Sequence, residues 1–170
     1  IKLRHVSRAS GPGTLTEIRL AGNPAGRNLR EVAEILGKLG ASKSVRTKSM
    51  AMLERLAESE AQAHGTDADL VTFQLVSVVE VVSAAWALEE LAVNEVNSRP
   101  APWFGGFADG ENGKASLPLP ATLVLLKDKP VFESGAMEEL ITPVGALLLD
   151  TLVDDFISAP PPPGPANRLA

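Results

Sequence analysis

The chain has no cysteine, no tyrosine and two histidines, His5 and His64, among its 170 residues. Without cysteine it forms neither a disulfide framework nor a thiolate metal site, and this suits an intracellular compartment, either the cytoplasm or an organellar matrix. His5 falls in a predicted edge strand. His64 ends a charged helix, where an imidazole interacts favourably with the helix dipole. We therefore expect structural or solvent-exposed roles for both histidines.

An excess of basic charge is also missing, as is any long hydrophobic run. The formal net charge is −5, whereas a nucleic-acid-binding domain carries a basic footprint for phosphates. The longest apolar run, residues 145–153, is interrupted by Asp150 and is too short to cross a bilayer. We therefore expect no nucleic-acid partner and no membrane insertion.

Recognisable catalytic motifs are absent as well. The sequence has no HxxxH pair, no EF-hand loop, no glycine-rich loop between a strand and a helix, and no GxSxG. Its paired carboxylates are adjacent in sequence, so they diverge on a helix and indicate solvated faces; they are Glu89-Glu90, Glu138-Glu139 and Asp154-Asp155. Motifs alone therefore reveal no active site.

What the sequence does contain is a mixed pattern of helices and strands, with 45% hydrophobic residues. Capping boxes at Asn28-x-x-Glu31 and Ser77-x-x-Glu80 indicate helix starts. Four to five helices are expected, at residues 28–40, 42–64, 77–92, after Pro120, and from 142 to about 156. Strands are expected at 1–8 and 14–20 as a hairpin, and at 70–76, 95–97 and 131–132. The predicted class is α+β, with a small mixed sheet.

One domain is expected over residues 1–157, because this length can bury a substantial core. Residues 98–120 are rich in glycine and proline and show little periodicity, so we expect an irregular segment there. Residues 158–170 form a proline-rich tail that is expected to be extended or polyproline II.

The segment LVTFQLVSVVEVVSAAWALEEL, residues 70–91, is expected to be a short strand followed by a buried helix. Thr72 and Gln74 are two residues apart, so on a strand they point to the same face. A pair at this spacing before a helix commonly places two metal ligands or two catalytic groups. The presence of a threonine and a glutamine at these positions therefore bears on whether the protein is an enzyme.

Seven stretches, in register over most of the chain, give the sequence a resemblance to the central region of the LarC family, the nickel-insertion proteins that complete the nickel-pincer cofactor of lactate racemase. They are HVSR (5–8), NLREVAEIL (28–36), MLERLAESEAQAHG (52–65), SAAWALEEL (83–91), GGF (105–107), LPLPATLVLLKDKPV (117–131) and EELITPVGALLLDTLVD (138–154). The resemblance implies a LarC-like α+β fold. It also implies a parent activity, nickel insertion into a pyridinium bisthiocarboxylate mononucleotide with CTP hydrolysis.

The resemblance also implies a metal-handling cluster that this chain has lost. The family's His-x-His-Glu pattern corresponds to Thr72, Gln74 and Leu75, and a four-residue turn after it is deleted. The family's histidine-rich loop corresponds to residues 22–28, which contain no histidine, and its Ala-His-Gly corresponds to Glu111-Asn112-Gly113. The remaining oxygen donors, Glu80, Asp109 and Glu111, suit Mg²⁺ or Ca²⁺ better than nickel. We favour ordinary loop and cap roles for these donors.

Two hypotheses follow. We favour a pseudoenzyme with no catalytic residue and no metal or other cofactor, whose fold is kept as a structural or assembly subunit of a larger protein complex. The alternative is an active nickel-insertion protein with a rebuilt metal site, a CTP-dependent nickel insertase of the lyase type that uses nickel and CTP.

Protein partners would need anchoring residues, and the stretch PAPWFGGF (100–107) supplies three of the seven aromatics. Trp is among the residues that most often dominate binding energy at interfaces. We expect Phe104 and Phe107 to fold back onto the core and Trp103 to be the most exposed. The predicted partner-binding residues are Trp103, Phe104 and the tail prolines Pro160, Pro161, Pro162 and Pro163.

Overall fold

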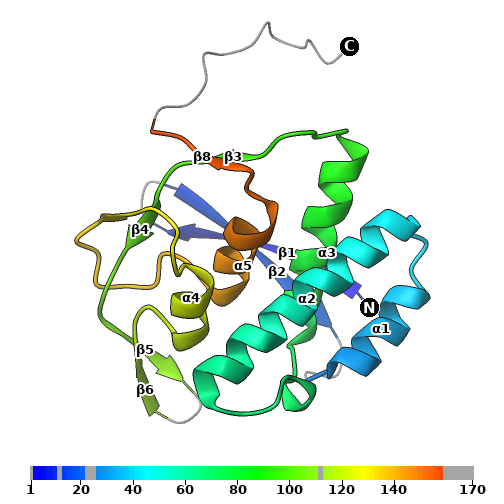
Figure 1. The fold of residues 1–170 in the computed structure, drawn as a ribbon, viewed down its shortest axis with the longest axis horizontal. Coiled ribbons are helices and arrows are strands. Elements are labelled where there is room, and N and C mark those ends of the chain that lie inside the picture. Colours follow the sequence, from blue (N-terminus) through cyan, green and yellow to red (C-terminus); the bar gives the residue numbers. More distant parts are fainter. Residues whose placement is uncertain (1, 11–12, 22–25, 111–112, 159–170) are drawn as a thin grey trace, which may run out of the picture. The chain divides into compact units, whose positions relative to one another are not determined.

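The computed structural model describes residues 2–10, 13–21, 26–110 and 113–158, with side chains described for 26–108 and 113–158. Within this part the chain forms five α-helices, one short 3₁₀ helix and eight strands (Figure 1). The strands pair two by two, with both parallel and antiparallel pairs, so the predicted α+β class is confirmed. The chain divides into two compact units, Ile1–Ala92 (unit 1) and Val93–Ala170 (unit 2). Among the described helices, none has the length and apolarity needed to cross a membrane.

Unit 1 begins with the predicted hairpin. Strands β1 (Lys2–Ser10) and β2 (Gly13–Ala21) are antiparallel, and their register runs from the pair Lys2–Ala21 to the pair Ser10–Gly13. A short connection of two residues fits this antiparallel pairing.

Three α-helices follow the hairpin in the described part of unit 1. They are α1 (Leu29–Gly37), α2 (Lys43–His64) and α3 (Leu75–Glu90), and α2 packs against both of the others (Figure 1). The predicted bounds of α2 are confirmed: the Ser42 Oγ accepts a hydrogen bond from the Val45 N–H at 3.0 Å, and Gly65 adopts a left-handed φ of 64°. Only glycine takes that conformation at no steric cost, so it ends the helix.

The core of unit 1 is aliphatic. Val32, Leu53, Ala57 and Val81 have no exposed surface. A neighbouring cluster joins the start of α2 to α3, and it consists of Ala41, Val45 and Ala85 with Leu39 and Trp86 packed against it. The wide apolar face predicted for α3 is therefore buried in the core of unit 1.

The described residues of unit 2 form three strand pairs and two helices. Strand β3 (Asn97–Ser98) pairs in parallel with β8 (Asp155–Phe156), and β4 (Ala101–Trp103) pairs in parallel with β7 (Val131–Glu133). Strands β5 (Phe107–Gly110) and β6 (Gly113–Ser116) form an antiparallel ribbon, and helices α4 (Pro120–Leu125) and α5 (Pro143–Leu152) contact each other. The proline at the first position of each helix was predicted, and Thr142 caps α5 as expected.

The expectation of an irregular segment at 98–120 is wrong. Strands of two to four residues lie there, and two of them pair with segments far along the chain. The last helix also ends at Leu152, short of the predicted position 156, because Asp155 and Phe156 pair with β3 instead. Pairing between distant segments leaves no local periodicity in the sequence.

Candidate functional site

The start of α1 is fixed by the predicted capping box. The Asn28 Oδ1 accepts a hydrogen bond from the Glu31 N–H at 3.0 Å, and the Glu31 Oε2 accepts one from the Asn28 N–H at 3.1 Å. Each side chain satisfies a backbone donor that the helix cannot satisfy itself. This fixes the direction in which residues 26–28 enter the helix.

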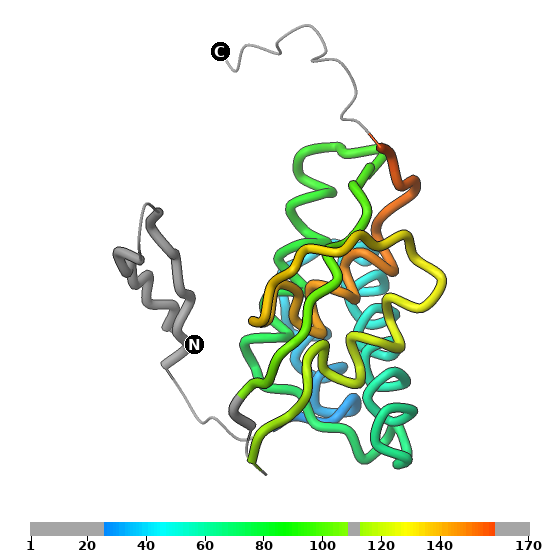
Figure 2. Tube along the Cα trace, turned by 90° about the vertical axis from the view of Figure 1, so that its left-hand side faces the viewer, coloured from blue at the N-terminus to red at the C-terminus, as the bar shows by residue number. Residues whose placement is uncertain are grey.

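The start of α3 differs from the prediction. In place of a strand over 70–76, a 3₁₀ turn (η1, Ala68–Leu70) is followed by a short extended segment, and the helix begins at Leu75 with Gln74 as its N-cap. The path of the chain from α2 to α3 can be followed in Figure 2. The predicted Ser77–Glu80 capping box is wrong, since Ser77 already donates its N–H to the Gln74 carbonyl, at 3.1 Å, inside the first turn. Burial of the apolar face of α3 overrides the β propensity of its valines.

The two helix entrances lie side by side. Arg27 and Phe73 exchange both backbone hydrogen bonds, at 2.9 and 2.8 Å, as an antiparallel bridge. Gly26 packs closely on Thr72, because a Cβ built on Gly26 would lie 2.7 Å from the Thr72 Cβ and 2.7 Å from its Oγ1. Residues 26–28 and 72–74, called here the paired segments, therefore form one continuous strip in unit 1.

Within this strip, Thr72 and Gln74 are both exposed while Phe73 between them is buried at 4% exposure. This alternation is that of an extended chain, so the expectation that Thr72 and Gln74 share a face is met although no long strand forms. Gln74 makes no side-chain hydrogen bond to the helix that it caps. The strip thus presents a hydroxyl and an amide to solvent, with the half-buried Leu75 next in the chain.

Few of the other predicted oxygen donors can be placed with their side chains. Glu80 is exposed on α3, and the backbone of Asp109 lies in β5. Glu111 and Asn112 lie outside the described residues, as do Pro160 to Pro163. In the part of the chain with described side chains, no group of three or more His, Cys, Asp or Glu residues is placed to hold a metal ion.

His64 lies at the end of α2, as predicted, and is exposed. Its Nε2 is 3.4 Å from the Glu60 Oε2, one helical turn earlier. Burial raises the pKa of Glu60 above its usual value, and the nearby His64 offsets part of this rise. The pair is local to one helix and belongs to the structural roles expected for the histidines.

The aromatic stretch is arranged differently from the prediction. Phe104 folds back onto the core with 2% exposure, as expected, so its side chain is poorly placed for a partner contact. Phe107 does not fold back and is 69% exposed, whereas Trp103 is half-buried in β4. The prediction that Trp103 is the most exposed aromatic of the stretch is therefore wrong. Phe107 follows two glycines and begins the β5–β6 ribbon, and the two glycines were the available signal that the chain leaves the core there.

A groove between α1 and α2 in unit 1 had no counterpart in the sequence analysis. Its volume is about 230 Å³, and it is lined by Ala33, Leu36, Gly37, Arg46, Thr47 and Met50. The small residues Ala33 and Gly37, four apart on one helix, were the sequence signal for a shallow helix face.

Comparison with known proteins gives a consistent result. A family model described as "Nickel insertion protein" matches residues 1–167. A protein of Syntrophobacter fumaroxidans named for nickel insertion is 36% identical over 157 residues, which cover 90% of this chain and 40% of that protein. The "Pyridinium-3,5-bisthiocarboxylic acid mononucleotide nickel insertion protein" of a Thermotoga species is 37% identical over 136 residues, covering 77% of this chain and 33% of that protein.

The chain thus spans about 40% or less of the length of these relatives. No solved structure matches it. The family match runs through both units of the fold, and it includes the paired segments at the entrances of α1 and α3. The chain therefore belongs to the nickel insertion protein family.

Proposed function

We propose that this chain is a nickel-insertion-family domain that no longer handles nickel and that serves as a structural or assembly subunit of a larger protein complex. The observation that carries the proposal is the strip formed by the paired segments. The resemblance places family histidines at positions 72 and 74 and in the loop that corresponds to residues 22–28, whose last three residues belong to the strip; the Arg27–Phe73 bridge joins the two segments. This pairing supports a ligand-site frame that has kept its backbone and lost its imidazoles.

The replacement of histidine should weaken nickel binding, because of the ligands that nickel prefers. Divalent nickel favours imidazole nitrogen, and neutral hydroxyl and amide oxygens are poor substitutes for it. Thr72 and Gln74 provide such oxygens on the exposed face of the strip, and Leu75 stands where the resemblance places a carboxylate. A rebuilt site made from Glu80, Asp109 and Glu111 would offer oxygen ligands, which suit Mg²⁺ or Ca²⁺.

Exposed apolar side chains in unit 2 support a role in assembly. Phe107, Phe132 and Met137 are 69%, 51% and 73% exposed. The chain packs tightly at Gly106, where an added Cβ would lie 2.8 Å from the Met137 carbonyl carbon, so the backbones of residues 106 and 137 lie against each other. Large exposed apolar side chains that gather on one surface often mark a protein contact. The proposed contact surface is this patch together with the half-buried Trp103.

Isothermal titration of the purified chain with Ni²⁺ tests the loss of nickel handling. We expect no dissociation constant tighter than about 1 mM, because imidazole is missing from the strip. The double variant Thr72→His/Gln74→His should bind more tightly than wild type but should stay weaker than about 1 µM, since the surrounding shell that orients such ligands is not restored.

The single variant Thr72→His is the matched control, because one added imidazole cannot chelate. It should bind nickel more weakly than the double variant. A micromolar dissociation constant for the wild-type chain would overturn the proposal and favour an active protein with a rebuilt site.

A further inference from the structure

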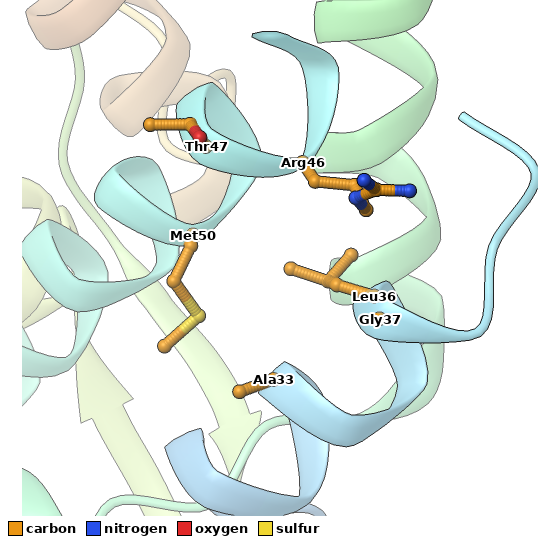
Figure 3. Close-up of a pocket in the computed structure, with 6 residues that line it drawn as sticks. All are labelled: Ala33, Leu36, Gly37, Arg46, Thr47 and Met50. Atoms are coloured by element: carbon orange, nitrogen blue, oxygen red, sulfur yellow. The ribbon is translucent and has the colours of Figure 1, made fainter. Parts of the chain in front are cut away.

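The groove between α1 and α2 lies within unit 1 (Figure 3), and no residue of the paired segments lines it. Its walls are the Ala33 and Gly37 positions of α1 and the Thr47 and Met50 positions of α2, with Leu36 at its base. Figure 3 shows the side chains of Ala33 and Met50 projecting toward one another across the open space. Small-molecule sites usually have about 300–1,000 Å³. At about 230 Å³, this groove instead matches one or two aliphatic side chains.

Arg46 lies at one end of the groove and is held in place by the main chain. Its Nη1 donates to the carbonyl oxygens of Ala41, at 3.0 Å, and Leu39, at 3.4 Å. A guanidinium has five N–H donors, so Nε and Nη2 keep donors for another acceptor. Within the described part of the chain, no carboxylate lies within ion-pair distance of Arg46.

The helices that line the groove carry a net positive charge in an otherwise acidic chain. Residues 29–54 contain five basic and three acidic residues, while the whole chain carries a net charge of −5. Besides Arg46, the basic residues include Lys38, Lys43 and Lys48, and all three of these lysines are exposed. Charge segregated in this way attracts a partner of opposite sign and increases its rate of association.

From this apolar groove with its anchored guanidinium and basic rim, we infer a docking site for an acidic protein segment. The segment inserts one aliphatic side chain between α1 and α2 and places a carboxylate beside Arg46, where an arginine fork can bind it in a bidentate manner. This inference rests on the proposed role as a subunit and names the chemistry of one partner. Single-stranded nucleic acid fits less well, because the lining offers no aromatic ring on which bases could stack.

Peptide display against the purified chain tests the site and selects a ligand in the same experiment. A library of random twelve-residue peptides is panned on the wild-type chain and on the variant Ala33→Phe. Ala33 is an exposed helical position that lines the groove, so the larger ring fills the space without disturbing the core. We expect wild type to enrich peptides with Asp or Glu on both sides of a Leu, Ile or Val. The Ala33→Phe variant should lose that enrichment.

Two further variants separate docking from folding. Ala51→Phe makes the same change at an exposed position of α2 outside the groove, and it should keep wild-type enrichment. Lys43→Glu reverses a rim charge at the first position of α2, where an acidic residue favours the helix dipole, so the fold is not weakened. By fluorescence anisotropy, an enriched peptide should bind Lys43→Glu about tenfold more weakly than wild type, and its binding to wild type should weaken with added salt.

Three outcomes would overturn the inference: no enrichment on wild type, enrichment without acidic residues, or enrichment that survives Ala33→Phe. Displacement of the peptide by an equal concentration of a single-stranded oligonucleotide would assign the surface to nucleic acid instead. These outcomes are independent of the nickel titration, so a failure here is distinguishable from a failure of the proposed function.

Discussion

The variant Val81→Asp should lose most of the stability of unit 1. Val81 lies in the middle of α3 and has no exposed surface, so the substitution buries a carboxylate without a partner. A change of this kind costs on the order of 3–5 kcal/mol, a large part of the 5–15 kcal/mol that stabilises a typical domain. Thermal unfolding followed by circular dichroism should show a much lower melting temperature or no cooperative transition.

Ser83→Asp is the matched control, because Ser83 is exposed two residues further along the same helix. It should change the free energy of unfolding by less than about 0.5 kcal/mol. If Val81→Asp melts within about two degrees of this control, the face of α3 that carries Val81 is not buried.

Gly26→Val should separate the paired segments. A Cβ at Gly26 would lie 2.7 Å from the Thr72 Cβ, which is too close for two carbon atoms. The backbone of Gly26 is not in the left-handed region, so the strain comes from this contact alone. Relieving it by moving the segments apart, with loss of the Arg27–Phe73 bridge, should cost about 1–3 kcal/mol of unfolding free energy.

Thr72→Gly removes the atoms that the new side chain would meet. In a double-mutant cycle measured by chemical denaturation, Gly26→Val should therefore be less destabilising in the Thr72→Gly background than in wild type. The coupling energy should be of the order of 1 kcal/mol or more. Additive effects of the two substitutions would show that residues 26 and 72 are not in contact, and the strip would have no structural basis.

The helix caps could be predicted because their signals are local. Asn28 and Glu31 are three residues apart, and Ser42 and Thr142 each bond to a backbone N–H three residues on. The start of α3 could not, since an alternating run of β-branched residues fits a strand as well as a buried helix. Burial of this segment against other elements decides that it forms a helix.

The strip of paired segments lay beyond sequence reasoning for a different reason. The sequence pattern identified Thr72 and Gln74 as a pair, and it identified residues 22–28 as a separate loop. Only the backbone bridge between Arg27 and Phe73, 46 positions apart, places the two segments together. The same holds for β3 with β8 and β4 with β7 in unit 2, whose pairing spans long stretches of chain.

A nickel-insertion assay tests the central claim most directly. The chain is incubated with Ni²⁺, CTP and pyridinium-3,5-bisthiocarboxylic acid mononucleotide, and nickel-loaded nucleotide is measured by mass spectrometry. The Thermotoga relative named for this reaction serves as the positive control. We predict no product above the protein-free background. Product that forms in proportion to the concentration of the wild-type chain would contradict the loss of nickel chemistry.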